Sequence, residues 1–86
     1  MRIPKKPYYV TMTDSFMSGW GMARGRTAKF VVGVDNYAQA QRIARNARCR
    51  SEMKYVNIVR NKPRYDPRRY QVTYRDYSQL GMAWKR

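Results

Sequence analysis

The sequence is short of several residue types that stable sites and cores commonly use. It contains no histidine, one cysteine, one leucine and only five acidic residues among 86. Without histidine, and with Cys49 as the one thiol, the usual zinc-ligand sets and an intramolecular disulfide are both excluded. No run of about 18 apolar residues occurs, which excludes a membrane-spanning helix. We therefore expect no metal and no membrane partner.

The composition also offers little for catalysis. General acid–base chemistry would depend on five carboxylates, which stand mainly at expected element ends or in turns, where capping and charge balance account for them: Asp14, Asp35, Glu52, Asp66 and Asp76. The pair Gly19 and Gly21 lacks the third glycine of a dinucleotide-binding fingerprint, and no Walker-type phosphate loop occurs. We expect neither enzymatic activity nor a cofactor.

What the sequence does contain is positive charge. The 19 basic residues give a formal net charge of +14, and thirteen of them are arginine. Such a surface repels itself unless a polyanion or acidic surface lies against it, and arginine both forks onto phosphate and stacks on rings. Eight tyrosines and two tryptophans accompany the cations. The composition favours nucleic acid, DNA or RNA, as the partner, with an acidic host protein or nucleoprotein complex as the rival.

The length of 86 residues predicts one small α+β domain. Residues 1–7 form a basic arm with no apolar run behind it, which indicates a cytoplasmic protein. Residues 78–86 have no period, and two interpretations stay open: a flexible tail, or a segment that folds back through Leu80, Met82 and Trp84.

Side-chain alternation and β-branched residues predict four strands, over residues 8–13, 27–34, 53–60 and 69–77. Between the second and third strands, Asn36 is a helix N-cap with Gln39 in capping-box position. An apolar stripe at helical spacing follows: Ala40, Ile43, Ala44 and Ala47. The order is ββαββ, which predicts a four-stranded, mainly antiparallel sheet with the helix packed on one face.

Two prolines within residues 61–68 predict a hairpin that joins the last two strands. The sheet face away from the helix is then uncovered. Aromatic and basic side chains on that face would form a platform on which bases can stack.

The first candidate binding element is the outward face of the helix and its end, which carry Arg42, Arg45, Arg48 and Arg50. The alternative is an ordinary solvated helix face. No acidic residue lies between Asn36 and Ser51, so we expect these cations to have no ion-pair partners along the helix. Phosphate contact is therefore the favoured interpretation.

The second candidate is the loop over residues 14–26, where Trp20 stands between two glycines and Arg24 and Arg26 flank a third. Tryptophan and arginine stack on bases or fill a partner's pocket. The alternative is that the apolar residues of this loop form a small satellite core over the sheet. The sequence leaves both interpretations open.

The third candidate is the expected hairpin loop over residues 62–70, which joins four cations to two tyrosines on a proline-stiffened frame: Lys62, Arg64, Arg68, Arg69, Tyr65 and Tyr70. A β-ribbon with arginine at its tip can enter a nucleic-acid groove. The alternative is a solvated turn in which Asp66 neutralises a neighbouring arginine.

Four strings carry a resemblance that spans roughly residues 8–75: DSFMSGWG at 14–21, DNY at 35–37, MKYVNI at 53–58 and KPRY at 62–65. The chain resembles small uncharacterised proteins of bacteriophages and mobile elements. That family brings no established activity and no site residues. The resemblance implies a genetic context, and with it the cytoplasm of a bacterial host.

The leading hypothesis is a small basic phage or mobile-element protein that binds nucleic acid with low sequence specificity through arginine–phosphate contacts and aromatic stacking. A second hypothesis is a phage-encoded inhibitor of a host protein or nucleoprotein complex, such as an anti-CRISPR, anchored by residues 16–22. A third is a structural subunit of a virion or ribonucleoprotein.

Overall fold

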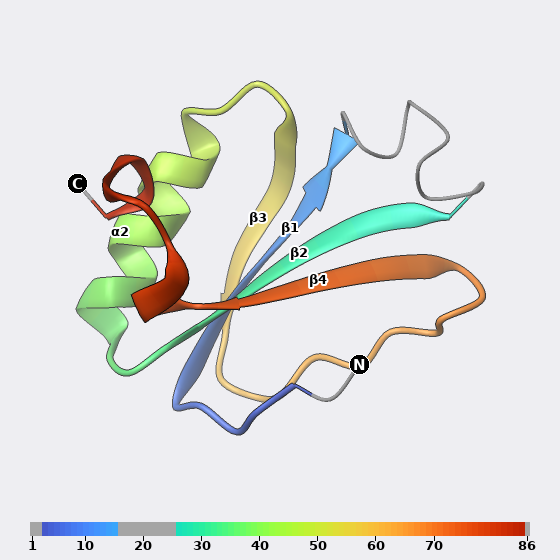
Figure 1. Ribbon diagram of the computed structural model, residues 1–86, viewed down its shortest axis with the longest axis horizontal. Coiled ribbons are helices and arrows are strands. Elements are labelled where there is room, and N and C mark those ends of the chain that lie inside the picture. The colour runs from blue at the N-terminus through green and yellow to red at the C-terminus, as the bar shows by residue number, and fades with distance from the viewer. Residues whose placement is uncertain (1–2, 16–25, 86) are drawn as a thin grey trace.

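The computed structural model describes residues 3–15 and 26–85, and it confirms the α+β class and the ββαββ order (Figure 1). The strands are β1 (Tyr8–Asp14), β2 (Thr27–Val34), β3 (Met53–Val59) and β4 (Tyr70–Asp76), and the helix is α2 (Tyr37–Arg48). Two short 3₁₀ turns follow, η1 (Tyr77–Gln79) and η2 (Met82–Trp84). The four strands form one sheet.

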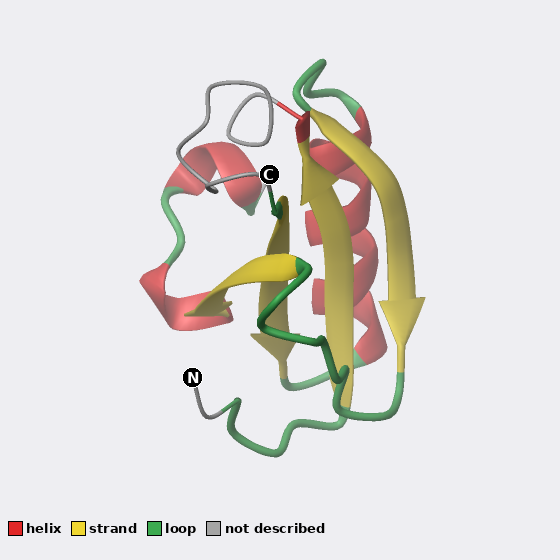
Figure 2. Cartoon of the chain, turned by 90° about the vertical axis from the view of Figure 1, so that its right-hand side faces the viewer, coloured by secondary structure: helices red, strands yellow, loops and turns green. Residues whose placement is uncertain are grey.

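The strand order in the sheet is β3-β1-β2-β4. β1 pairs antiparallel with both β2 and β3, whereas β4 pairs parallel with β2. The sheet is therefore mixed, and the hairpin predicted over residues 61–68 is wrong because β3 and β4 lie at opposite edges. Residues 60–69, called here the crossing segment, instead cross the sheet face away from α2. Helix α2 and the crossing segment therefore lie on opposite sides of the sheet (Figure 2).

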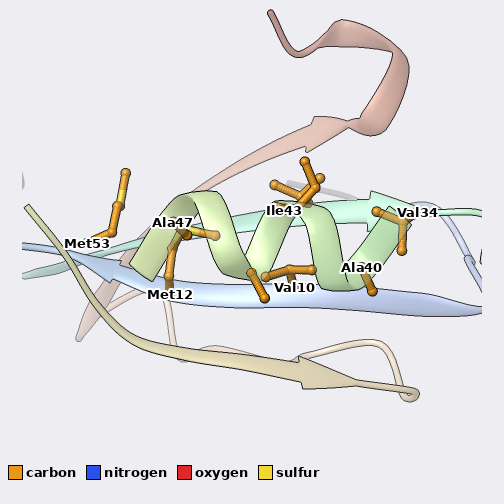
Figure 3. Packing of buried hydrophobic residues seen from close by; sticks show 9 residues of the cluster. Val10, Met12, Val34, Ala40, Ile43, Ala47 and Met53 are labelled. Carbon is orange, nitrogen blue, oxygen red and sulfur yellow. The ribbon is translucent and has the colours of Figure 1, made fainter. Parts of the chain in front are cut away.

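Helix α2 begins after Asn36, the predicted N-cap, but the Gln39 side chain bonds the residue before Asn36 rather than closing a capping box with it. Asn36 accepts a hydrogen bond from the Gln39 backbone N–H at 2.9 Å, and the Gln39 side chain accepts one from the Asp35 backbone N–H at 2.8 Å. The predicted apolar stripe is buried against β1 and β2 (Figure 3). Three of its four residues are alanine, which lets the helix approach the sheet closely and turns its arginines outward.

The opposite face of the sheet is partly covered, contrary to the sequence-based prediction. Tyr9 is fully buried there, and its hydroxyl donates to the Pro4 carbonyl and accepts from the Lys6 backbone N–H, each at 2.7 Å. These bonds fold residues 3–7 back and bury Ile3 beside Val31. Tyr65 from the crossing segment packs on the same cluster. Apolar side chains on this face need a cover, and the amino-terminal segment and the crossing segment supply it.

The C-terminal segment folds back onto the helix side of the sheet. Leu80 and Trp84 pack against the core, and the Trp84 ring stacks on Phe30 with 5.5 Å between ring centroids. The Asn46 side chain donates to the Trp84 carbonyl at 2.8 Å. Met82 stays exposed. Of the two open interpretations of residues 78–86, the described part therefore supports the folded one.

Candidate nucleic-acid interface

The sheet face away from α2 carries a groove of about 570 Å³, called here the sheet-face groove. Its lining residues come from the amino-terminal segment, the residue before β2, the crossing segment and β4: Ile3, Arg26, Lys62, Pro63, Arg64, Tyr65, Pro67, Tyr70, Gln71 and Val72. The fold thus brings together Arg26, Arg64 and Tyr65, which sequence analysis had assigned to two different candidate elements.

Two tyrosines form the aromatic part of this groove. The ring centroids of Tyr65 and Tyr70 lie 5.3 Å apart with a 57° angle between the planes, and the Lys29 ammonium lies 5.9 and 5.6 Å from them. Lys29 is held in place because it donates to the Thr13 hydroxyl at 2.7 Å. Burial raises the pKa of Tyr65, against the opposing effect of its hydrogen bond with Thr11. The hydrogen bond with Thr11 restrains the Tyr65 ring, and the Tyr65 hydroxyl is neutral at pH 7.

Hydrogen bonds to backbone carbonyls of the crossing segment hold it beside the start of β2. The Arg26 guanidinium donates to the Pro67 carbonyl at 3.0 Å, and the Thr27 backbone N–H donates to the Arg69 carbonyl at 2.9 Å. Asp66 closes the turn, since its side chain accepts from the Arg68 backbone N–H at 2.9 Å. Asp66 thus orders the backbone at this turn, a role that the sequence alternative of charge neutralisation did not anticipate.

Arg68 and Arg69 are exposed in the turn that precedes β4. They stand next to Tyr70 in the chain and extend the positive charge of the sheet-face groove toward solvent. Two of the three arginines of the predicted hairpin therefore occupy a turn at the start of an edge strand, at the end of the molecule away from α2 (Figure 1), whereas Arg64 lines the groove.

A second groove, of about 550 Å³, lies between α2 and β3 and is called here the helix groove. Its lining is Tyr37, Ala38, Gln41, Arg42, Ala44, Arg45, Arg48 and Ile58. The three arginines are exposed and recur every third residue, so they follow one side of the helix. Nearby, the Arg60 guanidinium lies 5.6 Å from the Tyr8 ring centroid.

The two grooves occupy opposite faces of the sheet. α2 packs on the face that carries Val10, Val32 and Val34, whereas Tyr65 packs on the face that carries Tyr9 and Val31. The helix arginines and the arginines of the crossing segment therefore do not form one continuous surface. Each groove presents its own set of cations.

Arg50 is separated from the other helix arginines. Its guanidinium lies 4.1 Å from the Trp84 ring centroid and 3.4 Å from the Glu52 carboxylate. Glu52 lies beyond the end of the helix, so the absence of acidic residues within the helix did not predict this ion pair. Arg50 stabilises the packing of the C-terminal segment.

The acidic residues near the amino-terminal segment are engaged by one lysine. Lys6 lies 3.3 Å from Asp35 and 3.4 Å from Asp76, and its hydrogen bond with Asp35 is the main cause of its raised pKa. The Tyr74 hydroxyl donates to Asp76 at 2.7 Å, and burial followed by this bond raises the pKa of Tyr74. None of the described residues that line the two grooves is acidic.

Trp20 and Arg24 lie outside the described residues, as does most of the loop over 14–26. The choice between a binding element and a satellite core in this loop is therefore open. The inhibitor hypothesis, which used residues 16–22 as its anchor, and the structural-subunit hypothesis stay predictions.

The sequence did not indicate which residues share a groove. Tyr70 and Lys62 line the sheet-face groove, and Tyr37 lines the helix groove. The sequence placed Lys62 and Tyr70 in the expected hairpin and gave Tyr37 no binding role, yet Tyr37 is half exposed. Only the pairing of β4 with β2 places Tyr70 beside Arg26, and no local sequence pattern encodes that pairing.

No protein-family model, curated protein or solved structure matches the chain. In the described part of the chain, no helix combines the length and apolar character needed to cross a membrane. Over the same residues, no group of three or more histidine, cysteine, aspartate or glutamate side chains lies close enough to hold a metal ion.

Proposed function

We propose that this protein binds nucleic acid with low sequence specificity, through phosphate contacts from arginines on both faces of its sheet. One observation carries the proposal: each groove combines cations with at least one tyrosine ring, and none of the described lining residues is acidic. A lining of this composition favours a polyanion, and the rings beside the cations favour a ligand with aromatic parts.

The helix groove suits a phosphate backbone. Arg42, Arg45 and Arg48 span about 9 Å at 1.5 Å per helical residue. Over that length of duplex axis, one strand carries about three phosphates, at one per 3.4 Å of axial rise. Arginine is suited to this contact because its guanidinium donates two parallel hydrogen bonds to phosphate oxygens. Contacts of this kind fix position and carry no sequence information, so specificity is low.

A salt titration tests the proposal. Binding of fluorescent duplex DNA, single-stranded DNA and RNA is measured by anisotropy between about 50 and 300 mM salt. If about six to eight phosphates are neutralised, log K falls with log salt at a slope of about −5 to −7 on duplex, and less steeply on single strands. Weak binding at low salt without a steep slope would contradict the proposal.

Arg75→Gln is the matched control in this experiment. Arg75 is an exposed arginine on β4 that lines neither groove, and its guanidinium donates to the Tyr74 carbonyl at 2.9 Å. This variant changes net charge by the same amount as any single groove substitution. A slope that changes equally for Arg75→Gln and for Arg42→Gln would mean that net charge alone, and not the helix groove, accounts for binding.

A further inference from the structure

The sheet-face groove differs from the helix groove in the chemistry of its lining. Besides three cations, it has two aromatic rings and four aliphatic or proline side chains: Ile3, Pro63, Pro67 and Val72. An apolar and aromatic wall suits a flat ring, and cations beside it suit an anionic group attached to that ring. A nucleotide has both parts.

The groove also has the size and the preformed shape of a small-ligand site. Its volume of about 570 Å³ falls within the range of about 300–1,000 Å³ typical of such sites. Its crossing segment is tied to β2 by the Arg26–Pro67 and Thr27–Arg69 hydrogen bonds. Two prolines restrict the same segment, so little ordering is needed when a ligand enters.

These features favour unpaired nucleotides over a duplex. The faces of bases inside a duplex are stacked on one another, whereas a base in a single strand is free to stack on a tyrosine ring. A duplex presents only its phosphates and base edges, for which the exposed arginines of the helix groove are better placed than recessed rings. The two faces of the sheet thus differ in the form of nucleic acid that their side chains favour.

We propose that the sheet-face groove is a single-strand subsite, in which a base stacks on Tyr70 while Arg26, Lys62 and Arg64 contact the adjoining phosphates. This proposal rests on the proposed function and names the substrate class that one of its two surfaces takes. The expected ligand is an unpaired nucleotide, which can belong to DNA or to RNA.

The test compares hexathymidylate, hexauridylate and a mixed-sequence duplex of twelve base pairs, all at one salt concentration. Tyr70→Leu removes the ring, and Tyr55→Leu is the matched control because Tyr55 is 76% exposed and lines neither groove. We expect Tyr70→Leu to weaken hexanucleotide binding at least fivefold, as the loss of one stacked base predicts. Duplex affinity should change less than twofold, and Tyr55→Leu should leave both affinities unchanged.

A second measurement on the unaltered protein keeps the test valid if Tyr70→Leu fails to fold. Backbone amide chemical shifts are followed by NMR as each hexanucleotide is added. Shifts concentrated at residues 62–72 support the subsite, and the stronger of the two ligands identifies DNA or RNA. Shifts confined to α2 overturn it.

Other outcomes separate this inference from the proposed function. Equal loss of hexanucleotide and duplex binding in Tyr70→Leu, or no loss in either, overturns the single-strand subsite while nucleic-acid binding stands. Absence of binding to all three ligands overturns both. A phosphotyrosine peptide that shifts residues 62–72 at lower concentration than either hexanucleotide also overturns the subsite, in favour of a protein ligand.

Discussion

The guanidinium of Arg50 lies 4.1 Å from the centroid of the Trp84 ring, and the same ring stacks on Phe30. Arg50 also pairs with Glu52. One side chain thus connects the end of α2, the segment before β3 and the C-terminal turn. Arg50, which the sequence groups with the candidate phosphate-binding arginines, therefore makes packing contacts within the fold.

This position predicts that Arg50→Ala lowers stability more than it lowers nucleic-acid affinity. Loss of the cation–π interaction and of the ion pair should cost about 1 kcal/mol, or about 4–8 °C in Tm for a domain of this size. Thermal unfolding followed by circular dichroism measures the change. Arg48→Ala is the matched comparison, because Arg48 is exposed at the end of the same helix. The prediction is contradicted if Arg50→Ala weakens duplex binding more than Arg48→Ala does.

Gly33 is predicted to reject any side chain. A Cβ built there would overlap the Tyr74 hydroxyl and lie 2.9 Å from the Lys6 Cγ atom. Gly33→Ala should therefore destabilise the protein by about 1–3 kcal/mol, as overpacking typically does. Gly81→Ala is the control, because a Cβ at Gly81 would meet nothing within 4 Å.

A double variant tests the stated cause of this clash. Adding Tyr74→Phe to Gly33→Ala removes the hydroxyl that the new Cβ would overlap, so part of the lost stability should return despite the loss of the hydrogen bond to Asp76. Chemical denaturation of both single variants and the double variant measures this coupling. Strictly additive losses would show that the hydroxyl is not the obstacle.

Three raised pKa values predict a loss of stability at alkaline pH. The pKa of Lys6 is raised chiefly by its hydrogen bond with Asp35, and those of Tyr65 and Tyr74 chiefly by burial. Each group holds its proton more tightly in the folded chain. The stabilisation is complete below the unfolded pKa values of about 10 and declines as pH rises toward the folded values.

Urea denaturation at intervals between pH 8 and 11 measures this decline. Tyr74→Phe removes one titrating hydroxyl. The unfolding free energy of this variant should therefore fall less steeply with pH, by a slope that corresponds to up to one proton, even though the variant is less stable at pH 7. Stability that stays constant or rises above pH 10 in the unaltered protein would overturn the linkage argument.

Removing helix-groove cations should lower the salt dependence of duplex binding. In the double variant Arg42→Gln with Arg48→Gln, the slope of log K against log salt should become less steep by about two, one for each phosphate that is no longer neutralised. Binding of hexathymidylate should fall less, since the sheet-face groove lies on the other side of the sheet. An unchanged duplex slope would exclude the helix groove from phosphate binding.

Tyr55 occupies a strained backbone position. Its φ is 56°, in the left-handed region that bulky residues avoid, at a bulge where β3 shifts its register against β1. Asparagine tolerates this region, so Tyr55→Asn should raise stability by about 0.5–1 kcal/mol. Lys54→Asn is the control, because Lys54 is an exposed neighbour on the same strand. The prediction is wrong if Tyr55→Asn is no more stable than Lys54→Asn in urea denaturation.

Much of the local structure could be predicted from the sequence because it depends on neighbours in the chain. The strand over 27–34 and the helix that begins after Asn36 follow the predicted bounds, since side-chain period and capping act within a few residues. The exposure of Cys49 and the burial of Ile43 follow from the same helical period. These features, the α+β class and the outward direction of the helix arginines were determined by the sequence itself.

Only the tertiary structure decided where the connecting segments lie. The prolines of residues 61–68 predict a turn but not its partner, and β4 pairs with β2 across the sheet rather than with β3. That pairing accompanies the burial of Tyr9 and Val31 on one face, where Tyr65 packs against them, so that residues far apart in the chain are joined. It also brings Arg26 and Tyr70 into one groove. The positive charge is a property of the sequence, but its division between two faces of the sheet is a property of the fold, because packing between distant segments selects which cations meet.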